Sequence, residues 1–277
     1  MTTISNLTKQ RIREYLLKGK RFDDRELLDL RNIEIETGIS KNSEGSARVK
    51  IGKTEILAGV KLDVSEPYTD SEESGTLITT LELLPLSSSK FEPGPPRIEA
   101  IEMARIVDRG IRESGFIDFE KLCIKKGEKV WGIFLDIFSI NDDGNLLDAA
   151  CLAAVAALKD AKMPKYDEKA DRVKYGEWTS KGLPLSKNLP ITLTFHKIGG
   201  NILLDPIKEE EEASEGRISL AFSGGVINAC QKGEEEVFDI KEMFELFDIA
   251  EKKTKEICDK VEKMIEKSIK KKENKEE

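Results

Sequence analysis

The sequence of 277 residues contains one histidine and four cysteines, which lie far apart at positions 123, 151, 230 and 258. Without a Cys-x-x-Cys pair or a second histidine, it offers neither a zinc ribbon nor a disulfide framework. It also lacks a Gly-x-Ser-x-Gly elbow, a Walker loop and a dinucleotide-binding glycine motif, which leaves those chemistries without support. The scattered thiols are typical of a reducing cytoplasm, where we expect the protein to reside.

Long apolar runs are also missing. No run approaches the ~20 residues needed to cross a bilayer, and the polar segment 1–20 has no secretory core, so we expect no membrane partner. Lysine and arginine number 45 and aspartate and glutamate 53, for a net charge of −8. This balance argues against unspecific coating of nucleic acid, because phosphate binding needs a positive field. It still allows a small basic stripe within an acidic chain.

The length predicts about two domains at roughly 150 residues each. Apolar alternation and β-branched runs predict strands over 45–62 (two strands joined at a turn), 76–86, 130–140, 191–198, 202–204, 217–223 and 226–231. Helical patterns cover 98–114, 146–161 and a long stretch from near residue 241. The segment 146–161 is so rich in alanine and leucine that it must be packed on most sides.

We therefore expect an α+β protein of two lobes, each with strands followed by a packed helix. The first lobe spans 1–165 and includes a short N-terminal helix, and the second spans 190–265. The polar segment 162–188 is the least patterned and is the expected link between them. The last residues, 266–277, are mostly charged and are expected to fray as a tail in solvent.

The helix predicted from residue 98 has two different sides. At ~100° per residue, Arg105, Arg109 and Arg112 fall within about 60° of one another, and Arg97 directly precedes the helix. Small and apolar residues group on the other side: Ala100, Met103, Ala104, Val107 and Ile111. Because a guanidinium group forks onto phosphate oxygens, the arginines are candidates for binding a polyphosphate backbone. The alternative is a solvated face balanced by acids of the same helix: Glu102, Asp108 and Glu113.

Acidic residues gather at two further places. Asp136, Asp142 and Asp143 lie on or after the strand at 130–140, and Glu209 to Glu212 precede a later strand. Paired carboxylates hold divalent cations or transfer protons. Acidic turns and charged loops are common, however, and nothing in the sequence fixes the mutual geometry of these groups.

Two single residues also stand out. The lone histidine, His196, lies in an alternating strand and is expected to be a paired structural residue. Trp178 lies in the polar link and either anchors that segment or stacks on a partner.

Four blocks of sequence together resemble one family: Gly45 to Val60, FEPGPP at 91–96, EMARIVDRGIRES at 102–114 and DDGNLLDAACLAAVAAL at 142–158. They are similar to the RNase PH-like subunits of the archaeal RNA exosome, and most of all to the non-catalytic one of the two ring subunits. The likeness extends over about residues 5–265, and the blocks occur in the order that the family has.

The resemblance implies an RNase PH-like fold with two βαβ-type lobes and a long C-terminal helix. It implies that the chain pairs with a catalytic relative, that three pairs close a hexameric ring around a channel, and that RNA-binding cap proteins join it. Such a ring degrades single-stranded RNA from the 3′ end with inorganic phosphate as nucleophile, and no cofactor or metal is implied. The arginines that the non-catalytic subunit contributes match Arg105 and Arg109; Arg112 and Arg97 extend the candidate set.

The departures from active relatives matter equally. Those chains follow the Asp143-Gly144 step with a Gly-Ser/Thr-Arg segment, whose backbone N–H groups and guanidinium hold the attacking phosphate. Here the same positions are Asn145, Leu146 and Leu147. Active relatives also have two acids six residues apart after a Leu-Asp step, and an ungapped count from Leu204-Asp205 places them on Glu211 and Arg217. Either change should cost orders of magnitude in rate, so the resemblance predicts an inactive chain.

Three hypotheses follow. In the first, the chain binds RNA through Arg105 and Arg109 while the chemistry takes place on a partner. In the second, the chain is itself a phosphorolytic nuclease with a reorganised site. In the third, it is an assembly scaffold whose arginines form only ion pairs between proteins.

Overall fold

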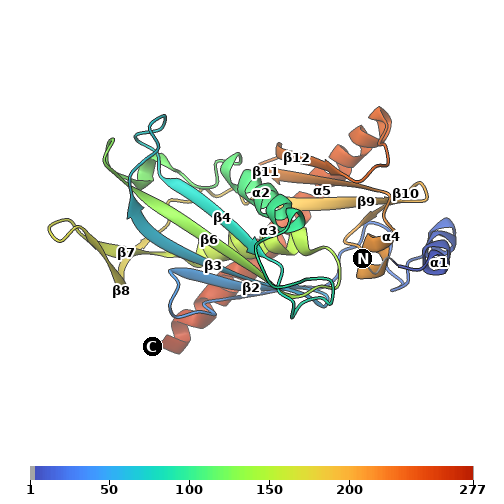
Figure 1. Cartoon of the computed structure of the whole chain (residues 1–277), viewed down its shortest axis with the longest axis horizontal. Helices are drawn as coiled ribbons and strands as arrows, with labels where there is room; N and C mark the ends of the chain where they lie inside the picture. The colour runs from blue at the N-terminus through green and yellow to red at the C-terminus, as the bar shows by residue number, and fades with distance from the viewer. Residues whose placement is uncertain (1–3, 277) are drawn as a thin grey trace.

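The computed structural model describes residues 4–276 (Figure 1). The larger of two main sheets has six strands: β1 (Ile33–Thr37), β2 (Gly45–Ile51), β3 (Thr54–Ser65), β4 (Thr76–Glu82), β5 (Cys123–Lys125) and β6 (Lys129–Asn141). Their order is β1-β2-β3-β6-β4, and β5 pairs with β6. Strands β4 and β6 run parallel and are connected through α2 (Ile98–Arg112), so this lobe contains a βαβ unit. A short 3₁₀ helix, η1 (Glu120–Leu122), precedes β5.

The second sheet has four strands: β9 (Ile191–Ile198), β10 (Asn201–Leu204), β11 (Gly216–Ser223) and β12 (Val226–Gly233). Their order is β10-β9-β11-β12, with every neighbouring pair antiparallel. Strands β10 and β11 therefore run in the same direction on either side of β9, and α4 (Lys208–Ala213) connects them. This is a βαβ-type arrangement split by a central strand, and the predicted α+β class with two such lobes is confirmed.

Helix α3 (Leu146–Asp160) lies between the two sheets and contacts β2 and β3 of one and β9 of the other (Figure 1). Every residue of α3 except Lys159 is buried, which confirms that this alanine-rich helix is packed on most sides. Small side chains let both sheets approach it closely. Helix α1 (Asn6–Leu17) contacts α4, and α5 (Ile240–Glu276) begins beside the second sheet and reaches β1 of the first. Of the helices within residues 4–276, none has the length and apolar character to cross a bilayer.

The expected link at 162–188 is more ordered than predicted. It forms a hairpin of β7 (Lys162–Asp167) and β8 (Arg172–Gly182), which projects from the body of the molecule (Figure 1). The register shifts twice along the pair, and most of β8 is exposed, so the sequence has no regular apolar alternation to indicate strands. Trp178 belongs to this hairpin and lies across from Pro164.

The prediction of a frayed tail over 266–277 was wrong for its described part, because α5 continues to Glu276. The Thr37 N–H donates to Ser268 Oγ at 2.8 Å, and Lys272 Nζ donates to the buried Asp160 Oδ1 at 2.9 Å. Ile265 is buried one turn earlier. These contacts attach the helix to the first lobe as far as Lys272, whereas composition indicates only the charge.

Candidate nucleic-acid interface

Helix α2 presents its apolar side to the protein and its arginines to solvent. Ala100, Ala104, Val107 and Ile111 are buried, as predicted, and α2 contacts β4, α3 and β12. Arg105 and Arg109 are exposed on the opposite side. The amphipathic pattern therefore orients the stripe correctly, since burying the apolar side leaves the arginines facing water.

The structure divides the four candidate arginines into two kinds. Arg97 forms an ion pair with Glu92. Arg112 donates to Asp108 through Nη2 and Nε at 2.9 and 3.0 Å and to the carbonyl of Leu77 at 2.9 Å. The hydrogen bonds with Asp108 raise the pKa of Arg112.

Arg105 and Arg109, by contrast, form no hydrogen bond or ion pair through their side chains with any residue that the structure describes. They stand on a ridge between two hollows. One, of about 340 Å³, lies between α2 and the β11–β12 hairpin and includes Ile98, Ile101 and Ser219 in its lining. The other, of about 380 Å³, lies on the β4 side and is lined by Thr79 and Asp108. The guanidinium groups are therefore accessible from both sides.

The start of α3 is where the resemblance implies a phosphate-binding segment in active relatives. Leu146 and Leu147 begin α3 with only 6% and 5% of their surfaces exposed, and both belong to the main core. Asn145 precedes them in the left-handed region at φ 58°. A Cβ added to Gly144 would lie 2.6 Å from the Pro206 carbonyl oxygen, so the chain after β10 lies directly against this turn. At these positions the chain provides neither a hydroxyl nor a guanidinium to an anion.

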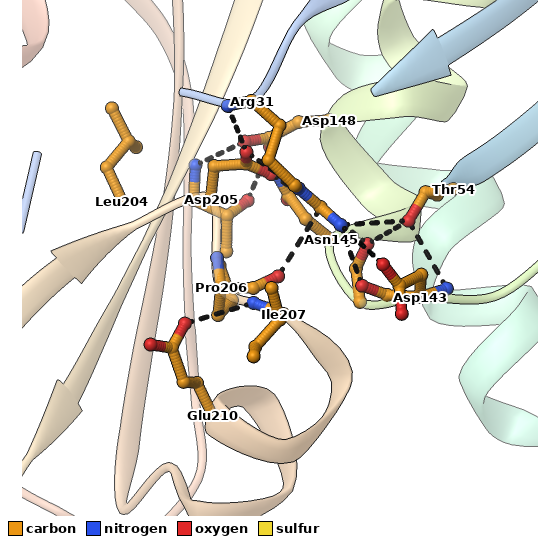
Figure 2. A network of polar contacts seen from close by, with 12 residues as sticks. Arg31, Thr54, Asp143, Asn145, Asp148, Leu204, Asp205, Pro206, Ile207 and Glu210 are labelled. Atoms are coloured by element: carbon orange, nitrogen blue, oxygen red, sulfur yellow. Dashed lines mark hydrogen bonds and ion pairs between the residues drawn. The ribbon is translucent and has the colours of Figure 1, made fainter. Parts of the chain in front are cut away.

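A buried polar network surrounds the same turn (Figure 2). Asp205, which is fully buried, accepts from Arg31 Nη2 at 2.7 Å, from Arg31 Nε at 2.9 Å and from Asn145 Nδ2 at 2.8 Å. Arg31 also donates to the carbonyls of Asp143 and Gly144, and Thr54 Oγ1 donates to Gly144 at 2.6 Å. Burial alone would raise the pKa of Asp205, but the hydrogen bonds from Arg31 lower it overall. The carboxylate thus stays charged and connects the two lobes.

The acidic candidates do not assemble into one site. Asp136 accepts from Thr80, Asp143 from Arg31, and the fully buried Asp142 carboxylate lies 2.5 Å from Lys208 Nζ. Lys208 also lies 3.6 Å from Glu211. Although burial would lower the pKa of Lys208, these carboxylates raise it. Among residues 4–276 no group of three or more histidine, cysteine, aspartate or glutamate side chains could hold a metal ion.

Two further buried groups take part in packing. Asp148 in α3 accepts from the Thr194 N–H at 3.0 Å and from Thr194 Oγ1 at 2.7 Å, yet burial raises its pKa to about 7. His196 Nδ1 lies 3.0 Å from Ser214 Oγ, and burial, together with the charge of Arg217, lowers its pKa to about 3. His196 is therefore a neutral residue of β9 that is paired through Nδ1, while its buried Nε2 has no hydrogen-bond partner among the described residues. All four cysteines are free thiols.

Protein-family models match the chain in two parts: domain 1 of the 3′ exoribonuclease family, RNase PH, over residues 29–164, and domain 2 over residues 188–253. The chain belongs to this family of RNase PH-like proteins, and the fold that the resemblance implied is confirmed.

Individual relatives and solved structures resemble the chain over nearly its whole length. The chain is 44% identical over 264 residues to the "Exosome complex component Rrp42" of Thermococcus onnurineus, covering 94% of this chain and 96% of that protein. The protein of the same description from Methanosarcina acetivorans is 44% identical over 256 residues, with coverages of 92% and 93%. A chain of the "archaeoglobus fulgidus exosome with RNA bound to the active site" superimposes with a TM-score of 0.85 at 38% identity, covering 92% of this chain and 98% of that one. A chain of an "Archaeal exosome core" superimposes with a TM-score of 0.82 at 35% identity, covering 93% of this chain and 97% of that one.

Arg31 and Thr54 were not predicted from the sequence, and Asp205 entered only as part of the Leu-Asp step that locates the two acid positions. All three meet around the Asp143-Gly144 turn although they come from separate parts of the chain. A single arginine or threonine beside a strand has no local pattern that indicates such a role. The Leu204-Asp205-Pro206 step at the end of β10 was the one available signal.

Proposed function

We propose that this chain is the non-catalytic ring subunit of an archaeal-type RNA exosome, and that it binds single-stranded RNA with Arg105 and Arg109 beside the catalytic site of an RNase PH-like partner. The observation that carries the proposal is the accessibility of these guanidinium groups, which have no carboxylate partner among the described residues. Free guanidinium groups bind phosphate oxygens and make no contact with the bases, so RNA affinity should depend little on RNA sequence.

The absence of chemistry in this chain is proposed on separate grounds. Phosphorolysis needs an anion site for the attacking phosphate. Leu146 and Leu147 are buried where the resemblance places the hydroxyl and the guanidinium. Arg217 stands at one of the two acid positions, and the other acid, Glu211, lies near Lys208. These residues support a role in binding and not in bond cleavage.

Assembly is part of the same proposal. Relatives described as exosome complex components cover nearly the whole chain, which supports pairing with a catalytic RNase PH-like subunit, three pairs to a ring, and association with RNA-binding cap proteins in the cytoplasm. The lobe boundaries at 1–165 and 190–265 belong to this proposal as well.

The test compares the purified chain, its co-expressed RNase PH-like partner and their complex in a phosphate-dependent assay for release of nucleoside diphosphates from oligo-RNA. Activity is expected from the complex and not from this chain alone. The double substitution Arg105→Glu/Arg109→Glu should weaken RNA binding by the complex while its size on gel filtration is unchanged. Release by the lone chain would support the nuclease hypothesis. Disrupted assembly with unchanged RNA affinity would support the scaffold hypothesis.

A further inference from the structure

Glu102 is the acidic residue best placed to neutralise the two free arginines. It lies on α2 three residues before Arg105 and seven before Arg109, so all three project from neighbouring turns on related sides of the helix. Residues at i and i+3 on a helix form ion pairs readily, above all when the acid comes first. Glu102 and both arginines line the same hollow. From the helix alone, an ion pair between Glu102 and Arg105 is expected.

The structure shows a different partner for this acid. Glu102 Oε1 accepts from Arg217 Nη2 at 2.6 Å, and Arg217 comes from β11 in the second lobe. The Arg217 side chain is only 19% exposed, whereas Glu102 is 36% exposed. The pair is therefore partly shielded from water, which strengthens it relative to a fully exposed contact.

A glycine makes room for this contact. Gly233 of β12 is the cross-strand partner of Arg217. A Cβ added at Gly233 would lie 2.7 Å from Arg217 Nη2 and 2.8 Å from Nε, so a larger residue would force the guanidinium to move. The absence of a side chain at residue 233 thus allows Arg217 to lie in the position from which it reaches α2.

Two other acids, Asp108 of α2 and Glu113 directly after it, are consistent with this arrangement. Asp108, adjacent to Arg109, accepts from both Arg112 and Thr79 Oγ1. Glu113 lies four residues after Arg109, and this order of cation before acid is the weaker one on a helix. Glu102 and Asp108 are thus both held by other cations, and within the described chain Arg105 and Arg109 form no ion pair with a carboxylate.

We propose that Arg217 is a positioning residue for RNA binding: by holding and neutralising Glu102, it keeps the Arg105 and Arg109 guanidinium groups available for phosphate. This inference rests on the proposed function. It also gives a role to the cation that stands where active relatives are implied to have an acid. Arg217 itself need not touch RNA, since its contact is with Glu102.

The experiment measures binding of a fluorescein-labelled oligoadenylate, as a function of salt, to complexes of the full-length chain with its co-expressed partner. Five forms are compared: wild type, Arg217→Gln, Glu102→Gln, the double substitution Arg217→Gln/Glu102→Gln, and Arg105→Glu/Arg109→Glu. Arg217→Gln should weaken binding about two- to fivefold at low salt, because the released Glu102 competes with phosphate for Arg105. It should also reduce the slope of log affinity against log salt concentration by up to about 0.7, which is the contribution of one bound phosphate on a single strand.

The double substitution provides the decisive readout. Removing the carboxylate as well as its partner should restore affinity to within about twofold of wild type, because no acid is then left to occupy Arg105. A merely structural role of Arg217 would not be rescued in this way. Unchanged binding by Arg217→Gln, or weak binding that the second substitution does not restore, would overturn the inference while leaving the proposed function intact. If Arg105→Glu/Arg109→Glu binds like wild type, the proposed function itself fails.

Discussion

Arg31 and Asp205 form a buried pair that joins the two lobes, with Arg31 Nη2 2.7 Å from Asp205 Oδ1. Arg31 precedes β1 of the first sheet, and Asp205 directly follows β10 of the second. Their side chains are 8% and 0% exposed. The pair also lies at the turn where the resemblance places phosphate in active relatives, and Arg31 binds the turn through the Asp143 and Gly144 carbonyls (Figure 2).

Removing one member of this pair should be severe. Arg31→Met leaves the buried Asp205 carboxylate with Arg25 as its one remaining cation, at 3.0 Å from Oδ2. Breaking a buried pair typically costs about 3–5 kcal/mol, and we expect a loss toward the lower end of this range. Chemical denaturation of the purified chain measures the loss. Arg48→Met, which removes a half-exposed arginine from the same sheet, is the matched control and should cost below about 1 kcal/mol. Equal losses in the two variants would contradict a special role for the Arg31 pair.

The free and the paired arginines of the candidate interface should contribute unequally to RNA binding. Arg105→Ala and Arg109→Ala should each reduce affinity, and together they should lower the slope of affinity against salt by roughly 1.4, or 0.7 for each phosphate that is no longer bound. Arg97→Ala serves as the control, because its guanidinium is already paired with Glu92. Fluorescence anisotropy at several salt concentrations makes the comparison. A similar effect from all three substitutions would show that general positive charge, and not the free pair, binds RNA.

Asp148 should make stability depend on pH. Its pKa rises from 3.8 in the unfolded chain to about 7 when buried, so the native state keeps a proton that the unfolded state has lost. Its contribution to stability is therefore full below about pH 4 and is lost as the pH rises toward 7. Asp148→Asn removes this loss. Between pH 5 and pH 8 the free energy of unfolding of the variant should therefore rise by about 1–3 kcal/mol relative to that of wild type.

His196 contributes with the opposite sign. Its pKa falls from 6.5 to about 3 on burial, so its contribution is full above about pH 6.5 and is lost as the pH falls toward 3. In wild type the two effects offset each other over the shared range, and the difference between wild type and Asp148→Asn isolates the carboxyl group. A difference that is constant from pH 5 to pH 8 would contradict the assignment to Asp148.

The end of the C-terminal helix should stabilise the first lobe. Lys272→Met deprives the buried Asp160 of its cation, although the Ser46 N–H still donates to Asp160 at 3.0 Å. We expect a loss of about 1–3 kcal/mol in unfolding free energy. Lys271→Met changes an exposed neighbour on the same helix and should have little effect. If both variants unfold like wild type, the contact of residue 272 with Asp160 contributes nothing to stability.

Patterns with a regular period were predictable from the sequence. The amphipathic spacing of α2 placed Arg105 and Arg109 outward, and the composition of 146–161 indicated a helix buried on most sides. The irregular pairing of β7 with β8 has no such period, so the segment was predicted to be a link between the lobes. The anchoring of α5 through Ser268 and Lys272 was missed because each contact depends on a residue more than 100 positions away.

Residue types and their short-range spacing were enough to predict the class of fold and the stripe of arginines, and the aliphatic pair Leu146-Leu147 can be read directly from the chain. Which arginines are free depends on the folded molecule. The four candidates, Arg97, Arg105, Arg109 and Arg112, are the same residue type but have different neighbours. Arg97 is paired with Glu92 of the preceding loop, and Arg112 with Asp108 of α2 itself. Glu102, the acid close to Arg105 on the helix, is held by Arg217 of β11. Ion pairing depends on distance in space, and distances between remote segments are set when the two sheets close on α3.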